Sequence, residues 1–205
     1  MLHLLDHPLT ADAVTRLRDK ATTPATFRRL AHIVGRMLAF DATRHLRTQP
    51  VKIDTPLEST ESPRLAAPGL VVVPILRAGQ SLVPPFLELV EEVAIGYIGL
   101  EREPGGAGLR QYYCKLPPLT DRPVFVVDPM LATGASAARA LQLVKEQGAI
   151  TPRLVCIFAA PPGVAEVERQ HPEVDIHAAV LDRELSARNY ILPGVGDFGD
   201  RLNGT

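Results

Sequence analysis

Residues 124–136 read VFVVDPMLATGAS, and this stretch decides the fold class. Its first four residues form a short apolar run that is typical of a buried strand. Beyond the loop residues 128–134, apolar side chains recur at positions 137, 140, 141 and 144, which is helical spacing. The stretch therefore predicts a strand, a short loop and the N-terminus of a helix.

The same pattern recurs along the chain. Apolar runs predict buried strands over residues 70–75, 93–100, 124–127, 154–158 and 176–180. Helical segments are predicted between and after them, over residues 85–92, 135–147 and 163–171. Continuous apolar runs that alternate with helices are typical of a parallel sheet covered on both faces. We therefore expect an α/β fold, as one domain over residues 1–205.

Two segments precede this alternating region. The first 47 residues predict a helical arm, in which one helix starts near Pro24 and Thr26. Apolar residues of that helix recur on one face at Phe27, Leu30, Val34, Met37 and Leu38. The polar, proline-rich stretch 48–68 predicts a loop or an edge hairpin.

Composition narrows the function classes. The 205 residues hold 22 Lys+Arg and 23 Asp+Glu, a net charge of -1, with 5% aromatics and no Trp. Neither a basic excess nor a base-stacking platform is present, so we expect no nucleic-acid binding. Cys114 and Cys156 lie outside any CxxC pattern, which argues against a zinc or redox site. No signal peptide and no apolar run of about 18 residues is present, so we expect a cytoplasmic protein without membrane contact.

The loop at 128–134 has the chemistry of a ribose phosphate site. Ligands of open α/β sheets bind at the carboxyl ends of the strands, and a helix N-terminus suits a phosphate. Gly134 permits close approach of the backbone, while Thr133 and Ser136 can donate hydrogen bonds. Asp128 is placed to accept hydrogen bonds from sugar hydroxyls. The alternative is that Asp128 and Thr133 only cap the helix.

Two further strand ends carry cations. Arg77 lies in a small-residue turn after the strand 70–75, where it is either an anion contact or an ordinary surface arginine. Arg102 opens the Gly-rich stretch 103–108, which is followed by Tyr112 and Lys115. We expect this segment to be a mobile loop that closes over a polyanion, or else a plain exposed hairpin.

The C-terminal stretch 190–200 reads YILPGVGDFGD and is rich in Gly and Pro. Such residues turn the backbone tightly, so free N–H and C=O groups could bind the edge of a flat, amide-like base. The alternative is a terminal arm that only packs on the domain.

Three motifs together resemble the uracil phosphoribosyltransferases, a family of type I phosphoribosyltransferases. They are VPILRAG at 73–79, VDPMLATG at 127–134 and YILPGVGD at 190–197, and the resemblance runs from about His7 to Thr205. It implies the type I phosphoribosyltransferase fold, with a central, mostly parallel sheet flanked by helices, an N-terminal helical arm and a C-terminal uracil-binding segment.

The resemblance also implies an activity, the conversion of uracil and 5-phosphoribosyl 1-diphosphate (PRPP) to UMP and diphosphate in pyrimidine salvage. It implies Asp128, Asp197 and Arg102 as catalytic residues. The implied PRPP site comprises Arg77, Arg102, Asp128, Pro129, Met130, Leu131, Ala132, Thr133, Gly134, Ala135, Ser136 and Asp197. The implied uracil site comprises Ile191, Gly196, Asp197 and Phe198, acting largely through backbone groups, and Tyr112 and Lys115 would lie on a flexible loop. Phe198 departs from the small Ala of many relatives.

Cofactor and partners follow from the same resemblance. Mg²⁺ is expected to arrive with PRPP, without a resident metal site. The proton of uracil N1 would go to Asp197 or to a diphosphate oxygen, since no His adjoins the motifs. A homodimer or larger homo-oligomer is expected, and GTP is an effector of some relatives. The alternatives are a regulatory, RNA-binding pyrimidine attenuation protein and a phosphoribosyltransferase for another base, such as a purine.

Overall fold

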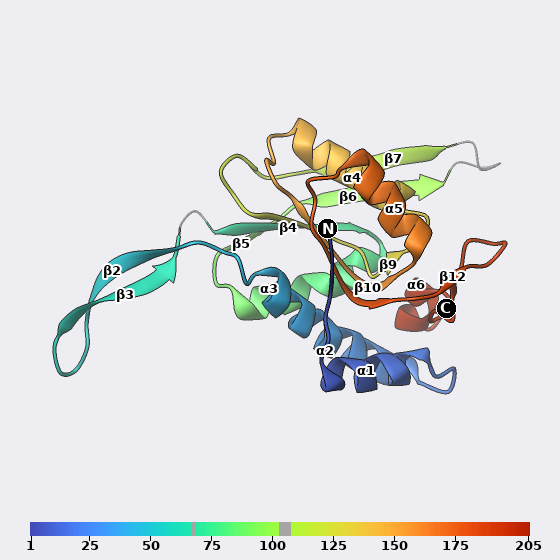
Figure 1. Cartoon of the computed structure of the whole chain (residues 1–205), viewed down its shortest axis with the longest axis horizontal. Coiled ribbons are helices and arrows are strands. Elements are labelled where there is room, and N and C mark those ends of the chain that lie inside the picture. Colours follow the sequence, from blue (N-terminus) through green and yellow to red (C-terminus); the bar gives the residue numbers. More distant parts are fainter. Residues whose placement is uncertain (67–68, 103–107) are drawn as a thin grey trace.

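The structure is a computed structural model that describes residues 1–66, 69–102 and 108–205, apart from the side chain of Arg102. Its core is a sheet in the strand order β1-β11-β10-β8-β4-β6-β7 (Figure 1). Two short strands extend it, because β5 pairs with β4 and β9 pairs with β10. The pairings are parallel except for β6 with β7, so the expected mostly parallel sheet is confirmed.

The strands of this sheet are β1 (Leu2–Leu4), β4 (Leu70–Leu76), β5 (Val93–Ile95), β6 (Tyr97–Arg102), β7 (Leu109–Lys115), β8 (Val124–Val127), β9 (Met130–Leu131), β10 (Arg153–Ala159) and β11 (Ile176–Leu181). The central strands are buried on both faces, as their continuous apolar runs predict. Successive residues of β4 alternate between two clusters, since Val72 packs into one and Val73 into the other.

Helices cover both faces of the sheet. They are α1 (Pro8–Arg18), α2 (Pro24–Ala42), α3 (Val83–Leu89), α4 (Ala135–Glu146), α5 (Pro161–Gln170) and α6 (Phe198–Asn203), with a 3-10 turn η1 (Ala78–Leu82). The helices α1, α2 and α3 lie on one side, and α4 and α5 lie on the other (Figure 1). The predicted face of α2 is buried at Phe27, Leu30, Val34 and Leu38. Within the described residues, no helix is both long and apolar enough to cross a bilayer.

The stretch predicted as a loop or hairpin is a hairpin. The strands β2 (Thr48–Asp54) and β3 (Ser59–Leu65) pair antiparallel and project away from the body of the molecule (Figure 1). A second small ribbon joins β12 (Glu184–Leu185) to β13 (Ile191–Leu192) near the C-terminus.

Two expectations from the sequence were wrong in detail. The first 47 residues are not all helical, because Leu2, His3 and Leu4 form the strand β1, which pairs with the outer edge of β11. A three-residue strand is too short to show a hydrophobic period in the sequence. The predicted strand 93–100 is two strands that both pair with β4. They separate at Gly96, where a Cβ atom would lie 2.6 Å from the Leu116 side chain.

Candidate active site

The loop after β8 is held rigidly against β10. The backbone N–H groups of Ile157 and Phe158 both donate to the carbonyl oxygen of Pro129, at 3.1 and 2.9 Å. Met130 and Leu131 then form β9, a strand that the apolar pattern alone did not reveal. The loop is therefore a fixed part of the sheet edge, and α4 starts from it at a defined position.

Gly134 turns this loop into α4. Its φ of 83° lies in the left-handed region, and a Cβ atom here would lie 2.7 Å from the carbonyl oxygen of Gly163. No side chain caps α4, so the suggestion that Asp128 and Thr133 only cap this helix is wrong. The first N–H groups of a helix have no partner within the helix. Those of α4 are therefore available to an anion.

Asp128 follows β8 directly. Its Oδ1 accepts a long hydrogen bond of 3.4 Å from the N–H of Met130. Burial raises the pKa of the Asp128 carboxyl to about 7, and the Met130 hydrogen bond only partly opposes this. The neighbouring thiol of Cys156, on β10, also has a raised pKa, first because of burial and second because of the Asp128 charge. A carboxyl poised to change charge near neutral pH, at the mouth of a phosphate-type loop, is typical of a functional site.

Arg77 lies on the adjacent turn. It is exposed and directly follows β4, which pairs with β8 through Pro74 and Val127. The turn packs closely on the end of β8, because a Cβ atom on Gly79 would lie 2.4 Å from the carbonyl oxygen of Val127. The Arg77 turn and the Asp128 loop are therefore neighbours on one edge of the sheet.

Arg102 ends β6, the next strand beyond β4. The order β8, β4, β6 thus brings the loops of Asp128, Arg77 and Arg102 to consecutive positions on the same edge. The side chain of Arg102 and residues 103–107 lie outside the described part of the chain.

Tyr112 and Lys115 do not lie on a loop, which corrects that expectation. Both belong to β7, which pairs antiparallel with β6 from Lys115 opposite Tyr97 to Leu109 opposite Arg102. The Tyr112 ring packs over Gly99, where a Cβ atom would lie 2.5 Å from it. The pairing of β6 with β7 therefore continues up to the Gly-rich stretch on both sides. The alternative of an exposed hairpin is confirmed for these two strands.

The C-terminal segment reaches the same edge of the sheet. It starts at Asp182, just after β11. The N–H of Asp182 donates to the carbonyl oxygen of Ala159 at 2.8 Å. The segment ends in α6, which contacts the turn η1 that follows Arg77. Residues far apart in sequence are thus brought beside the Arg77 and Asp128 loops.

Two glycines shape this segment. Gly194 has a φ of 59°, and a Cβ atom there would lie 2.0 Å from the carbonyl oxygen of Ile191. Gly196 has a φ of 77° but open space around it, since the nearest atom to its Cβ position is 3.9 Å away, on Arg201. The backbone at Gly196 is therefore accessible to a ligand.

The predicted uracil-site residues fall into two groups. Ile191 and Phe198 have buried side chains, and the Phe198 ring packs edge-on against Phe27 at 5.0 Å in the core. Asp197 is exposed, and its Oδ1 accepts from the N–H of Asp200 at 2.9 Å, which caps α6. The side chain of Phe198 therefore points away from the solvent-facing turn, and only its backbone can serve a ligand there.

Three charged residues that the sequence reasoning missed support this segment. Arg18 and the buried Asp182 form an ion pair that also binds Gly194. Arg201 donates to the carbonyl oxygens of Val195, Leu17 and Asp19, at 3.0, 2.6 and 2.6 Å. Asp182 follows a predicted strand, so applying the strand-end rule to that strand would have found it. No local signal marks Arg18, which is 164 residues away.

Over residues 1–66, 69–102 and 108–205, no three His, Cys, Asp or Glu side chains are grouped so as to hold a metal ion.

The fold is one that solved phosphoribosyltransferases also have. A hypoxanthine-guanine phosphoribosyltransferase from Bacillus anthracis shares the fold, with a TM-score of 0.52 at 12% identity over 78% of this chain and 80% of that one. The AQ2163 protein from Aquifex aeolicus has a TM-score of 0.93 at 32% identity, covering 98% and 97% of the two chains.

The particular family follows from the sequence comparisons. The profile of the uracil phosphoribosyltransferase family matches residues 4–205. The uracil phosphoribosyltransferase of Symbiobacterium thermophilum is 45% identical to this chain, over 98% of this chain and 97% of its own length. The uracil phosphoribosyltransferase of Staphylococcus aureus is also 45% identical, over 100% of this chain and 98% of its own length. The chain belongs to the uracil phosphoribosyltransferase family.

Proposed function

We propose that this chain transfers the phosphoribosyl group of PRPP to uracil, giving UMP and diphosphate. The observation that carries the proposal is the convergence of four segments on one sheet edge. These are the loops after β8, β4 and β6 and the C-terminal segment, in a chain of this family. The reaction needs groups that bind the ribose phosphate, cations that neutralise the diphosphate, and a site for the base. The proposed segments supply one or more of these each.

The proposed PRPP site is the segment 128–136, with Arg77, Arg102 and Asp197. The N-terminus of α4 offers unpaired N–H groups to the phosphate, and Thr133 and Ser136 add hydroxyl donors. Asp128 accepts hydrogen bonds from the ribose hydroxyls. Arg77 and Arg102 neutralise the diphosphate, for which guanidinium groups are well suited.

Uracil is proposed to bind at Ile191, Gly196, Asp197 and Phe198, through backbone groups. Support comes from the exposed backbone at Gly196 and from the Phe198 ring, which packs in the core and leaves its amide for the ligand. Tyr112 and Lys115 are proposed to face the bound PRPP from β7.

In the proposed reaction, the bond between the ribose C1′ and the diphosphate oxygen breaks, and the bond from uracil N1 to C1′ forms. Positive charge develops on the ribose, and the carboxylates of Asp128 and Asp197 are the nearby anions that favour it. The N1 proton passes to a diphosphate oxygen or to Oδ2 of Asp197, because Oδ1 already accepts from Asp200. Holding both substrates in line supplies much of the rate.

Mg²⁺ is proposed to enter with PRPP as part of the substrate, since hard cations prefer phosphate oxygens and water.

The whole chain is proposed to act as one domain, since the family profile spans residues 4–205. Its proposed location is the cytoplasm. GTP is a candidate effector, and initial rates with and without GTP test it.

Self-association is proposed from the projecting β2–β3 hairpin. An isolated two-stranded hairpin is only marginally stable in water. This hairpin is exposed along both strands, and Leu57 at its tip is 95% exposed. A second copy packed against the hairpin would stabilise it. Light scattering on the purified chain should therefore give at least a dimer mass, and a monomer mass would refute the proposal.

The activity itself is tested by incubating the purified chain with PRPP, Mg²⁺ and one base at a time while following diphosphate release. Turnover with uracil is expected, and its loss in Asp128→Asn with retention in the surface variant Arg29→Ala would assign it to this site. Turnover with hypoxanthine but not uracil would overturn the substrate. RNA binding that weakens with salt, without turnover, would favour a regulatory protein.

A further inference from the structure

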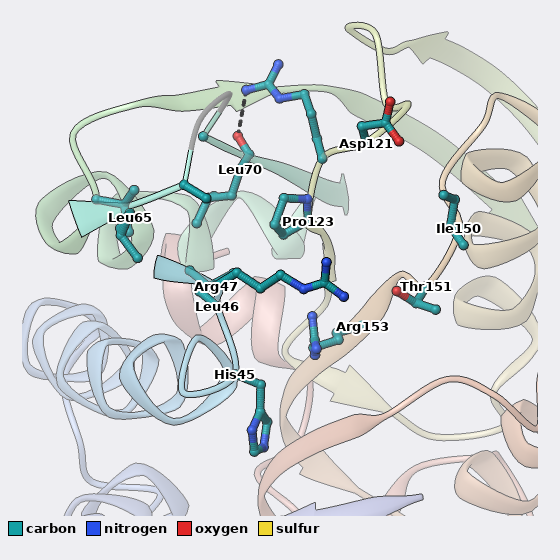
Figure 2. A pocket seen from close by; sticks show the side chains of 14 residues that line it. His45, Leu46, Arg47, Leu65, Leu70, Asp121, Pro123, Ile150, Thr151 and Arg153 are labelled. Carbon is teal, nitrogen blue, oxygen red and sulfur yellow. Dashed lines mark hydrogen bonds between the residues drawn. The ribbon is translucent and has the colours of Figure 1, made fainter. Parts of the chain in front are cut away.

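A cavity of ≈ 670 Å³ lies at the amino ends of the parallel strands. Its lining includes Leu70 at the start of β4, Pro123 just before β8 and Arg153 at the start of β10 (Figure 2). Asp128 and Arg77 follow the other ends of β8 and β4. A seven-residue strand such as β4 is about 20 Å long. The cavity is therefore separate from the candidate active site.

The lining of this cavity is cationic. Three arginines contribute to it, Arg47, Arg122 and Arg153, together with His45, while Asp121 is the acidic residue of the lining. In the part of the chain that the structure describes, the ion pairs within 4.0 Å that involve arginine are made by other arginines. Positive charge thus gathers in one cavity of a chain whose net charge is -1.

Two of these guanidinium groups contact the protein but leave donors without a partner. Arg122 is held by a 3.0 Å hydrogen bond from Nη2 to the carbonyl oxygen of Leu70, the dashed line in Figure 2. Arg153 lies 5.8 Å from the centre of the Phe125 ring. The Nε atoms of both Arg122 and Arg153 are buried, and neither has a hydrogen-bond partner among the described residues.

Arg47 and Arg153 line the same cavity from different elements. Figure 2 shows the Arg47 side chain extending from the segment before β2 toward the start of β10, where Arg153 and, just before it in the chain, Thr151 also line the cavity. Positive charges that line one cavity repel each other. An anion bound in the cavity would offset this repulsion.

We propose that this cavity binds a phosphate-bearing small molecule. Arg47 and Arg153 hold the phosphate oxygens, with the Thr151 hydroxyl as a further donor. Guanidinium forks match phosphate geometry, and charge-assisted hydrogen bonds of this kind are the strong ones. The site is independent of the proposed transferase activity, because none of its residues belongs to the PRPP or uracil sites.

The test uses inorganic triphosphate as the probe and the full chain as the protein. Calorimetric titration compares the wild type with Arg47→Ala and with the matched control Arg29→Ala, an exposed arginine of α2. Loss of one charged hydrogen-bonding group should weaken binding about tenfold in Arg47→Ala. The control should bind as the wild type does. Equal affinity in all three proteins, or no binding, would overturn the proposal.

A second measurement locates the bound probe, since triphosphate could also enter the PRPP site. Phenylglyoxal modifies arginines, and mass spectrometry reports which ones triphosphate protects. Protection of Arg47 supports the cavity, whereas protection confined to Arg77 refutes it. If Arg47→Ala instead lowers the molar mass measured by light scattering and Arg47 shows no protection, the cavity is a subunit contact and the proposal fails.

Arg153→Gln is a deeper variant of the same site. It keeps a polar side chain but is shorter than arginine and loses the charge and the contact with Phe125, so it can lower stability by itself. A thermal unfolding scan distinguishes loss of stability from loss of probe binding. If Arg153→Gln does not fold, the test rests on Arg47→Ala, because Arg47 is exposed.

Discussion

Arg18 and Asp182 form a two-pronged ion pair beneath the C-terminal segment. Nη1 and Nη2 of Arg18 lie 2.9 and 2.5 Å from the two carboxylate oxygens of Asp182. Both residues also hold Gly194, since Arg18 donates to its carbonyl oxygen at 2.7 Å and Asp182 accepts from its N–H at 3.1 Å. Because Gly194 is held through both its N–H and its carbonyl oxygen, the turn that leads to Gly196 and Asp197 is fixed. Arg18 and Asp182 are therefore positioning residues for the proposed base site.

Arg18→Ala should loosen this turn and leave a buried carboxylate unpaired. Breaking a buried pair costs about 3 kcal/mol of unfolding free energy. We expect that loss, together with an increase of about tenfold in KM for uracil and a smaller change in kcat. Arg18→Lys should restore the charge but not the two-pronged geometry, so it should recover only part of the affinity.

The control for Arg18 is Arg16→Ala on the same helix. Arg16 pairs with Asp12 at 3.7 Å on the exposed surface. Such pairs contribute less than about 1 kcal/mol. An Arg18→Ala enzyme with the stability and KM of Arg16→Ala would show that the pair does not position the turn.

Asp128 should make stability depend on pH. Its folded pKa of about 7 lies above the ordinary value of 3.8, so the folded state binds more protons than the unfolded state between those two values. Stability should therefore fall as pH rises from about 4 to about 7. The loss should be on the order of 2 kcal/mol, less than the full pKa shift implies, because residue Asp128 as a whole keeps some exposure to solvent. Asp128→Asn should remove this slope in urea unfolding measured across that range. An unchanged slope in Asp128→Asn would contradict the prediction.

Gly134→Ala should disturb the phosphate-type loop. The added Cβ would meet Gly163 at a positive φ, which costs about 1 to 3 kcal/mol and shifts the start of α4. We expect loss of stability together with a large rise in KM for PRPP. Gly148→Ala is the matched control, because Gly148 has a φ of 100° at the far end of α4. It should lose stability without the rise in KM, and equal KM changes in both variants would contradict a loop-specific role.

Asp197 has two roles that variants can distinguish, the cap of α6 and the proposed acceptance of the uracil N1 proton. Asparagine caps helices about as well as aspartate does, whereas alanine costs about 1 kcal/mol. Asp197→Asn should therefore unfold like the wild type but turn over uracil slowly, and Asp197→Ala should lose both properties. Near-native turnover in Asp197→Asn would assign the N1 proton to a diphosphate oxygen instead.

Much of the architecture could be predicted because burial leaves a local signature. The run at 70–75 lies in a strand that is buried on both faces, and the recurring apolar residues of 24–42 face the core. Short elements escaped prediction, because β9 and β13 have only two residues each and depend on their partners. The strand position of Tyr112 likewise depends on pairing with β6, which composition does not encode.

The sequence by itself determined the alternation of strands and helices and the motifs at 73–79, 127–134 and 190–197, since hydrophobic period and turn residues are local properties. Only the tertiary structure decided which side chains meet. It brought Arg18 to Asp182 across 164 positions, turned the Phe198 ring into the core and gathered Arg47, Arg122 and Arg153 around one cavity. The physical reason is that strand order and helix packing set these neighbours, and both are satisfied only when the whole sheet is assembled.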